Sequence, residues 1–302
     1  APMLDSKGKL LGVAQVLNRR GGQAFDEEDE QLLVALVTQL QIAIERAKLT
    51  EAFVEKQKLD SALRLARNIQ MSMLPTEFPD PASTGVELHA TLEAAKDVGG
   101  DFYDFFWVDE RRLCLVVADV SGKGIPAALF MAKAKTVIKA NAALLPEPER
   151  ILKRANQELA RDNDAGMFVT VFLGLLDVVT GRLDYSNGGH NHPCSVRGKE
   201  IGSIDGAESV ALAIVESADF QSDVHQLEPG DTLVLYTDGL TETKEDGRET
   251  MIGQEGLTRI MSELPPGQSV QQWGESLKTA TDRFRGTTPA HDDITLLLLR
   301  RR

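Results

Sequence analysis

The stretches Val98-Gly-Gly-Asp-Phe-Tyr-Asp104 and Ala118-Asp-Val-Ser-Gly-Lys-Gly124 decide the fold of this 302-residue chain. Between them lies an apolar run broken only by the polar residues 109–112, a pattern that predicts a β-hairpin. Asp101 and Asp119 would then stand at neighbouring strand ends, Asp101 directly after Gly100 and Asp119 shortly before the Ser121–Gly124 loop. Carboxylates at such corners bind hard cations such as Mg²⁺ and Mn²⁺, which prefer oxygen ligands.

Further acids stand at two more strand ends late in the chain. The apolar residues 233–236 run directly into Thr237-Asp238-Gly239, and Asp292-Asp293 opens the last apolar run, residues 294–299. A single acidic corner carries little information, but the acidic hairpin and these two further corners together predict a metal site.

The composition limits the classes of partner. The hydrophobic fraction of 42% and the charged fraction of 26% are those of an ordinary globular protein. A net charge of −13 argues against binding of nucleic acid or anionic lipid. Acids gathered around divalent ions would explain part of this charge, and an acidic surface that maintains solubility explains it equally well.

Cysteine usage and hydropathy predict a cytoplasmic location. Cys114 and Cys194 are the only cysteines, so no disulfide framework is implied and a reducing compartment fits. No apolar run approaches the roughly 18 residues of a membrane span. Because the sequence starts at Ala1 rather than at an initiator, we expect a fragment of a longer protein.

The N-terminal residues predict one strand and one very long helix. Residues 11–18 read as a strand, and the acids of residues 26–30 suit a helix N-terminus. Apolar residues then recur at helical spacing as far as Leu74, with no glycine or proline between Asp26 and Pro75. We expect a dimeric coiled coil along its apolar seam; the alternative is a helix packed on its own domain.

The rest of the chain contains runs of strands interrupted by two pairs of helices. The helical pairs are expected near residues 125–161 and 253–284, and the strands fill the intervals between them. This order favours a β-sandwich covered by helices over alternating βαβ units.

Two families resemble parts of this sequence. Residues 12–18, Phe25 and the acidic helix start resemble the last strand and helix of a GAF sensory domain. That resemblance implies a GAF remnant over 1–45, followed by a helical coiled-coil linker over 46–75. A lone strand and helix cannot bury a core, so residual dimer contacts are expected there instead of a ligand pocket.

The remainder resembles the SpoIIE-type phosphatases, a bacterial branch of the metal-dependent PPM (protein phosphatase 2C-like) family. The matching motifs occur in the family's order: Gln70 with Leu74-Pro75, Gly99-Gly100-Asp101-Phe102-Tyr103-Asp104, Ala118-Asp119-Val120-Ser121-Gly122-Lys123-Gly124, Asn187-Gly188-Gly189-His190, Tyr236-Thr237-Asp238-Gly239 and Asp292-Asp293-Ile294-Thr295. The resemblance implies an α+β fold, a four-layer αββα sandwich, over 76–302. It also implies hydrolysis of phosphoserine or phosphothreonine, with Mn²⁺ or Mg²⁺ as cofactor and an anti-anti-sigma-factor-like protein as substrate.

The resemblance also assigns roles to the acids. Asp119 would bridge two ions, with the Val120 carbonyl as a further ligand, and Asp101 would reach them from the facing strand. Asp238 and Asp292 would hold the second ion. Asp104 and Asp293 would support these ligands or hold a third ion, although an acid beside an acid often simply faces water.

The sequence does not decide which group binds the phosphate or protonates the leaving oxygen. His190 suits a general acid for the leaving oxygen, but hydrogen bonding that orders its own loop is the favoured interpretation. Eukaryotic relatives hold phosphate with an arginine near the first acid, where this chain has Lys96. The Ser121–Gly124 loop leads into a helix, and its backbone N–H groups could bind phosphate.

The acids favour an active phosphatase, because a degenerate relative would usually have lost Asp119 or Asp238. The alternatives are a non-catalytic module that binds a partner of a sigma-factor switching pathway, and a dimeric sensor that only relays a signal. For regulation we expect the end of the long helix, with Ile69, Gln70 and Met73, to pack on the helix that follows Asp119.

Overall fold

The computed structural model describes residues 1–5, 7–265 and 267–302, which form two compact units, Ala1–Leu65 and Ala66–Arg302. Across the described residues, no helix combines the length and apolar character that a membrane crossing requires.

The first unit contains two short strands and most of one helix. Strands β1 (Pro2–Leu4) and β2 (Leu10–Val13) pair antiparallel. The expected strand over 11–18 is therefore wrong in its bounds, and β1 was not predicted. β2 ends at Val13, the partner of Pro2, and Ala14 beyond it still donates its N–H to the Ala1 carbonyl at 2.9 Å.

Helix α1 (Glu27–Ser72) confirms the long helix. Asp26 accepts hydrogen bonds from the backbone N–H of Glu28 and Asp29, each at 3.1 Å, so it caps the helix. Several of the seam residues are largely exposed, among them Leu32, Leu36, Leu40, Leu49, Phe53, Leu59 and Leu65. An apolar seam of this length without a cover is typical of a helix that has a partner.

The second unit is built on two sheets. One has the strand order β10-β7-β6-β5-β4, with β11 also paired to β7, and the other has the order β3-β13-β12-β8-β9. The strands of the first are β4 (Phe102–Trp107), β5 (Arg112–Val120), β6 (Val169–Asp177), β7 (Arg182–Gly188), β10 (Glu208–Ser209) and β11 (Asp223–Gln226). Those of the second are β3 (Val86–Glu93), β8 (Cys194–Arg197), β9 (Glu200–Ser203), β12 (Thr232–Tyr236) and β13 (Ile294–Arg301).

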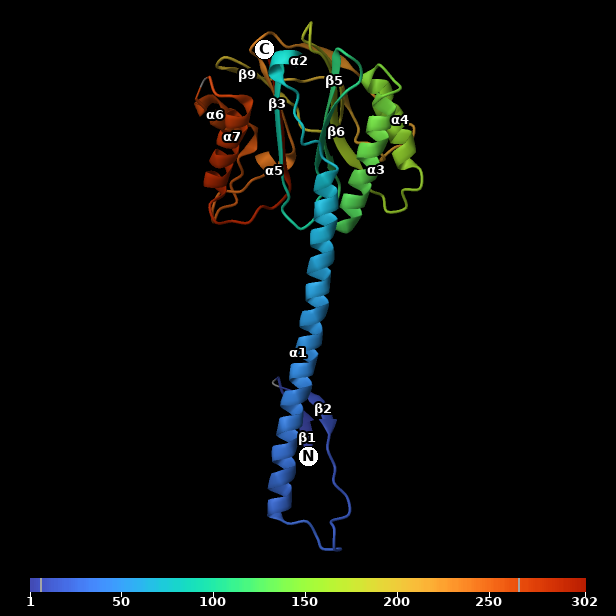
Figure 1. Cartoon of the computed structure of the whole chain (residues 1–302), viewed down its shortest axis with the longest axis vertical. Coiled ribbons are helices and arrows are strands. Elements are labelled where there is room, and N and C mark those ends of the chain that lie inside the picture. Colours follow the sequence, from blue (N-terminus) through green and yellow to red (C-terminus); the bar gives the residue numbers. More distant parts are fainter. Residues whose placement is uncertain (6, 266) are drawn as a thin grey trace. The chain divides into compact units, whose positions relative to one another are not determined.

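Helices cover both outer faces of the sheets, which confirms the four-layer αββα expectation (Figure 1). Helices α3 (Ile125–Ala142) and α4 (Pro148–Ala160) lie on the first sheet. Helices α6 (Gly253–Glu263) and α7 (Val270–Arg285) lie on the side of the second. Two short helices, α2 (Pro81–Thr84) and α5 (Asp238–Thr241), complete the unit. Both predicted helical pairs are thus confirmed.

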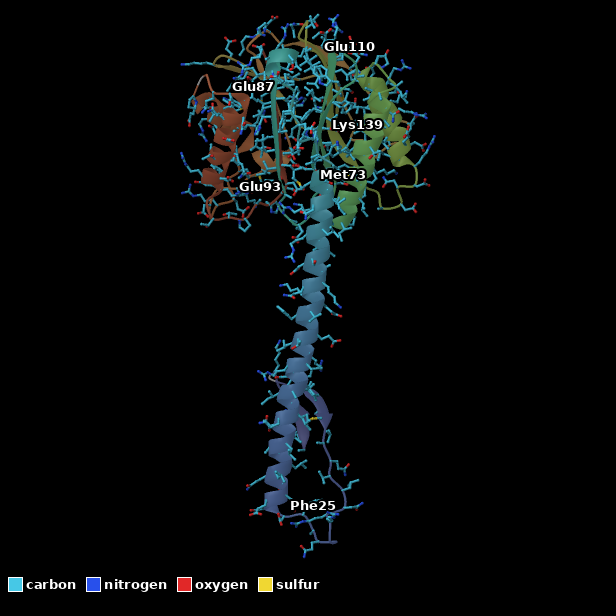
Figure 2. All side chains as sticks on the ribbon, in the orientation of Figure 1. Phe25, Met73, Glu87, Glu93, Glu110 and Lys139 are labelled. Atoms are coloured by element: carbon cyan, nitrogen blue, oxygen red, sulfur yellow. The ribbon has the colours of Figure 1, made fainter. Side chains whose placement is uncertain are left out.

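Charged pairs at both ends of β3 fasten it to α7 and to the C-terminus. Glu87 accepts a hydrogen bond from the backbone N–H of Val270 at 2.9 Å and pairs with Arg302, and Glu93 pairs with Lys278 and Arg285 (Figure 2). These contacts fix the edge of the second sheet, and β13, the neighbour of β3, begins directly after Asp292-Asp293.

Candidate metal centre

The predicted acidic corners of the two sheets meet at one end of the sandwich. Asp101 immediately precedes β4 of the first sheet. Its Oδ2 nevertheless accepts hydrogen bonds from the hydroxyls of Thr237 and Thr295, each at 2.7 Å. Both threonines belong to the second sheet's side, after β12 and on β13. Asp101 is therefore buried exactly where the sheets join.

Asp293 holds the glycine loop that leads to Asp101. Its Oδ1 accepts the N–H of Ala95 at 2.8 Å and its Oδ2 accepts the N–H of Gly100 at 3.0 Å. A β-carbon on Gly99 would lie 1.7 Å from the Asp293 Oδ2, so only glycine fits there. Asp293 thus holds the loop before Asp101 through two backbone N–H groups.

Two other glycines allow similarly close approaches. A β-carbon on Gly100 would lie 2.5 Å from the Val120 carbonyl oxygen, and one on Gly239 would lie 2.0 Å from the Asp293 carbonyl oxygen. The Val120 carbonyl therefore faces the loop before Asp101, and the Asp238 corner packs directly against the Asp293 backbone.

Mutual repulsion of the acids shows in their pKa values. Burial and the neighbouring Asp238 carboxylate raise the pKa of Asp119 to about 7. Burial, followed by Asp119, raises the pKa of Asp101 well above its usual range. Burial, Glu242 and Asp292 likewise raise the pKa of Asp238. Carboxyls that raise one another's pKa in this way form a site for positive charge.

Asp292 already has a cationic neighbour. Its Oδ2 lies 2.7 Å from the Nζ of Lys123, which also donates to the carbonyl of His291 at 2.8 Å. Lys123 comes from the Ser-Gly-Lys-Gly loop after Asp119, so this ion pair joins the first corner to the third.

The donor set fits a hard divalent ion, because it consists of carboxylate and carbonyl oxygens. Asp101, Asp119, Asp238, Asp292 and the Val120 carbonyl would hold it. Within residues 1–5, 7–265 and 267–302, however, no three acidic, histidine or cysteine side chains already have metal-site geometry. Two of the acids have protein partners instead: hydroxyls donate to Asp101, and Lys123 pairs with Asp292.

Asp104 lies away from these acids, against helix α3. It pairs with Lys135 of α3, lies 3.9 Å from Lys139 of the same helix, and is buried. Asp101 and Asp104 are three positions apart, so they project from opposite faces of the sheet. Asp104 therefore faces the helical layer, and neither of its predicted metal-related roles has a contact to support it.

His190 is buried and ordered by its own loop. Its backbone N–H donates to the Asn187 side chain at 2.7 Å, and its Nδ1 lies 2.9 Å from the Thr170 hydroxyl. Burial lowers the pKa of His190 to about 4, and the nearby Tyr236 carbonyl opposes this shift only partly. A neutral imidazole at pH 7 fits the loop-ordering interpretation better than general acid catalysis.

The end of α1 contacts the same glycine loop. The Gln70 side chain donates to the Gly99 carbonyl at 2.7 Å and accepts the Gly99 N–H at 3.3 Å. Of the other two predicted regulatory residues, Met73 is half-buried and Ile69 is 57% exposed. Gln70 is therefore the one that reaches the site directly.

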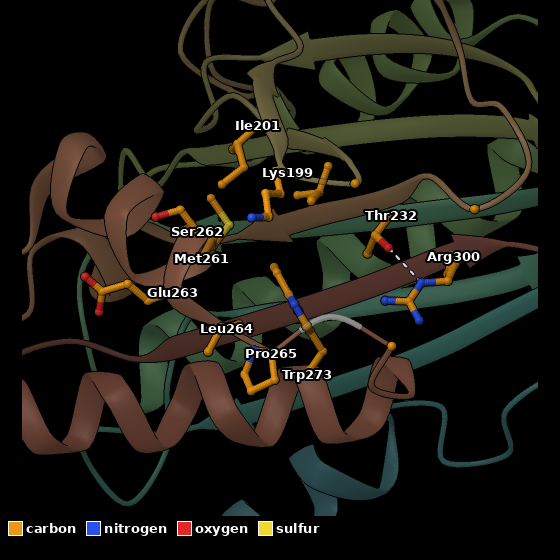
Figure 3. A pocket seen from close by; sticks show the side chains of 14 residues that line it. Lys199, Ile201, Thr232, Met261, Ser262, Glu263, Leu264, Pro265, Trp273 and Arg300 are labelled. Carbon is orange, nitrogen blue, oxygen red and sulfur yellow. Dashed lines mark hydrogen bonds between the residues drawn. The ribbon is translucent and has the colours of Figure 1, made fainter.

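Sequence reasoning missed the roles of Thr237, Thr295 and Lys123 as partners of the acids. Each stands inside a motif, one to four positions from an acid, so the motifs themselves were the available signal. A cavity of about 520 Å³, lined by Trp273, Met261, Thr232 and Arg300 among others, lies elsewhere (Figure 3). Thr232 and Arg300 are at the ends of β12 and β13 remote from the acids, so this cavity is not the metal centre.

Comparison with solved structures identifies the fold of this protein. The SiaA-PP2C domain of Pseudomonas aeruginosa superposes with a TM-score of 0.71 at 22% identity, over 82% of this chain and 98% of that one. RsbX in complex with magnesium superposes with a TM-score of 0.54 at 20% identity, over 74% of this chain and 98% of that one. The second unit has the fold of the PP2C-type phosphatases.

Sequence comparison narrows the class to a family. The chain belongs to the SpoIIE family (Stage II sporulation protein E), whose model matches residues 109–302. It is 29% identical to the phosphoserine phosphatase RsbU of Bacillus subtilis over 252 residues, which are 82% of this chain and 72% of RsbU. It spans 35% of Protein IcfG of Synechocystis and 45% of the phosphoserine phosphatase RsbP of Bacillus subtilis.

Proposed function

We propose that this chain is a divalent-metal-dependent protein phosphatase that hydrolyses phosphoserine or phosphothreonine on an anti-anti-sigma-factor-like protein. The observation that carries the proposal is the meeting of Asp101, Asp119, Asp238 and Asp292 at the junction of two sheets, with a donor set suited to Mn²⁺ or Mg²⁺. The substrate class is supported by the phosphoserine phosphatases RsbU and RsbP, and magnesium by the RsbX structure.

Each residue would have a role that follows from its position. Two or three divalent ions, when bound, supply positive charge to the transferring phosphoryl group and acidify an attacking water. Asp119 and the Val120 carbonyl would hold them from β5, Asp101 from the facing strand, and Asp238 with Asp292 from the second sheet. Asp293 keeps the glycine loop in place through Ala95 and Gly100.

Hydrolysis of p-nitrophenyl phosphate, with and without Mn²⁺, tests the proposal. We expect metal-dependent turnover that is lost in Asp238→Asn and retained in Asp164→Asn, an exposed acid outside the site. Titration calorimetry with Mn²⁺ on the same proteins separates the alternatives. If wild type neither binds Mn²⁺ nor turns over substrate, the phosphatase proposal is wrong and a partner-binding module is favoured.

Control of this site would operate through the end of α1. Both hydrogen bonds of Gln70 go to Gly99, two residues before Asp101, so a change at this end of the helix reaches a metal-binding acid through one loop. We expect Gln70→Leu to weaken Mn²⁺ binding and lower turnover, and the exposed neighbour Asn68→Ala to leave both unchanged. Equal behaviour of the two variants would contradict control through Gln70.

A GAF-type sensory segment over 1–45 and a coiled-coil linker over 46–75 would deliver the signal, and the exposed seam of α1 supports a homodimer. In such a dimer Ile69, exposed on one chain, would be covered by its partner. A charge at Ile69 would then change activity without touching the site.

A further inference from the structure

One basic residue lies at the acidic cluster. The Lys123 Nζ is 2.7 Å from Asp292 Oδ2 and 2.8 Å from the His291 carbonyl oxygen, and its charge acts on Asp238 as well. Both members of the ion pair are partly exposed, 36% for the Lys123 side chain and 33% for that of Asp292. The ammonium group therefore stands between two predicted metal ligands and the solvent.

The backbone of the loop that carries Lys123 is held firmly, and the side chain itself is held only at its end, by one ion pair and one hydrogen bond. Gly122 and Gly124, on either side, have φ values of +85° and +81°, a conformation that favours glycine. Ser121 is paired with Phe168, because its N–H donates to the Phe168 carbonyl and its hydroxyl accepts the Phe168 N–H, each at 2.9 Å. The backbone is thus fixed, and the four-carbon stem of Lys123 can change its partner.

Asp292 Oδ2 cannot serve the ammonium group and a divalent ion equally well. A divalent ion has the higher charge and is attracted by Asp119 and Asp238 together with Asp292, so it competes favourably for this oxygen. The released ammonium group would remain anchored beside the ions, facing solvent, where a phosphorylated side chain approaches.

We propose that Lys123 is an exchangeable counter-ion. It neutralises Asp292, is displaced from that carboxylate by the divalent ion, and then binds a non-bridging oxygen of the substrate phosphoryl group. This inference rests on the phosphatase function proposed above and gives the site its phosphate-binding cation. Lys96, the basic residue nearer to Asp101 in the sequence, is exposed.

Lys123→Met tests the inference because it retains the stem and removes the charge. If Lys123 competes with the metal, the variant binds Mn²⁺ more tightly, by about fivefold to tenfold in calorimetry. A purely structural lysine predicts the opposite, since loss of the ion pair would loosen Asp292 and weaken Mn²⁺ binding. In the same variant, inorganic phosphate should inhibit about tenfold less well, and KM for p-nitrophenyl phosphate should rise.

Two further variants complete the experiment. Lys123→Arg keeps the charge and should restore both the Mn²⁺ affinity and the phosphate inhibition of wild type, whereas Lys96→Met should resemble wild type in both. Unchanged or weaker Mn²⁺ binding by Lys123→Met overturns the counter-ion role, and unchanged phosphate inhibition overturns the phosphate-binding role. Failure of wild type itself to bind Mn²⁺ or to turn over substrate would instead reject the phosphatase function.

Discussion

Asp101 illustrates how much a single carboxylate depends on its partners. It is buried beside other acids, which raises its pKa, while the hydroxyls of Thr237 and Thr295 donate to one of its oxygens and oppose that shift. Both hydroxyls donate to the same oxygen, Oδ2. The two threonines orient the ligand as well as stabilise its charge.

His190 predicts a pH dependence of stability. Its pKa is lowered from 6.5 to about 4, so between these pH values the unfolded chain binds a proton that the folded chain does not. Stability is therefore retained above pH 6.5 and falls as the pH drops towards 4, by up to about 3 kcal/mol. Urea unfolding at a series of pH values, compared with His190→Gln, measures this contribution. NMR titration of the imidazole near pH 6.5 would contradict it.

At the scale of elements, Asp104 and Lys135 form a buried ion pair that joins β4 to α3. Lys135→Met leaves the Asp104 charge buried without its main partner, so we expect a loss of about 3 to 5 kcal/mol in unfolding free energy. Asp104→Leu with Lys135→Met removes both charges and should recover most of that loss.

The same double variant decides whether Asp104 binds metal. Because its side chain faces α3, we expect Mn²⁺ affinity equal to wild type in calorimetry. A large fall in Mn²⁺ affinity of a variant that unfolds normally in urea would place Asp104 in the metal centre after all.

The helices and strands themselves could be predicted well. Which face of a strand each side chain projects from was harder to predict. Apolar runs and turn residues located the hairpin of β4 and β5 and the helical pairs, since these signals are local. Asp104 was grouped with Asp101 although the two-residue period of a strand puts them on opposite faces. β2 forms by pairing with β1, and the pattern of residues 11–18 carries no information about that contact.

At the scale of the whole molecule, we expect the chain to be a dimer through α1. Its seam residues Leu36 and Leu40 are 55% and 53% exposed, more apolar surface than an isolated helix would normally leave in water. Sedimentation velocity over a concentration series should give a dimer, which Leu36→Glu with Leu40→Glu converts to a monomer. Gln39→Glu, a charge on an exposed polar position, is the control. A wild type that stays monomeric would contradict the dimer.

The order of the motifs predicted the two-sheet sandwich, because acids at strand ends mark where strands from different sheets converge. The sequence could not reveal that the convergence uses hydroxyls and a lysine as partners, because Thr237, Thr295 and Lys123 become neighbours of the acids only when both sheets are packed. Their places inside the motifs draw attention to them but do not say which acid each of them contacts.

Gly99, Gly100 and Gly239 matter for telling active family members from inactive ones. Each leaves no room for a methyl group against Asp293 or Val120, so a side chain there would displace the Asp293 carboxylate or a neighbouring backbone at the acidic corners. A family member could then keep every acid, fold normally and still fail to gather them. The three glycines are thus as informative as the carboxylates for sorting active enzymes from silent copies in a genome.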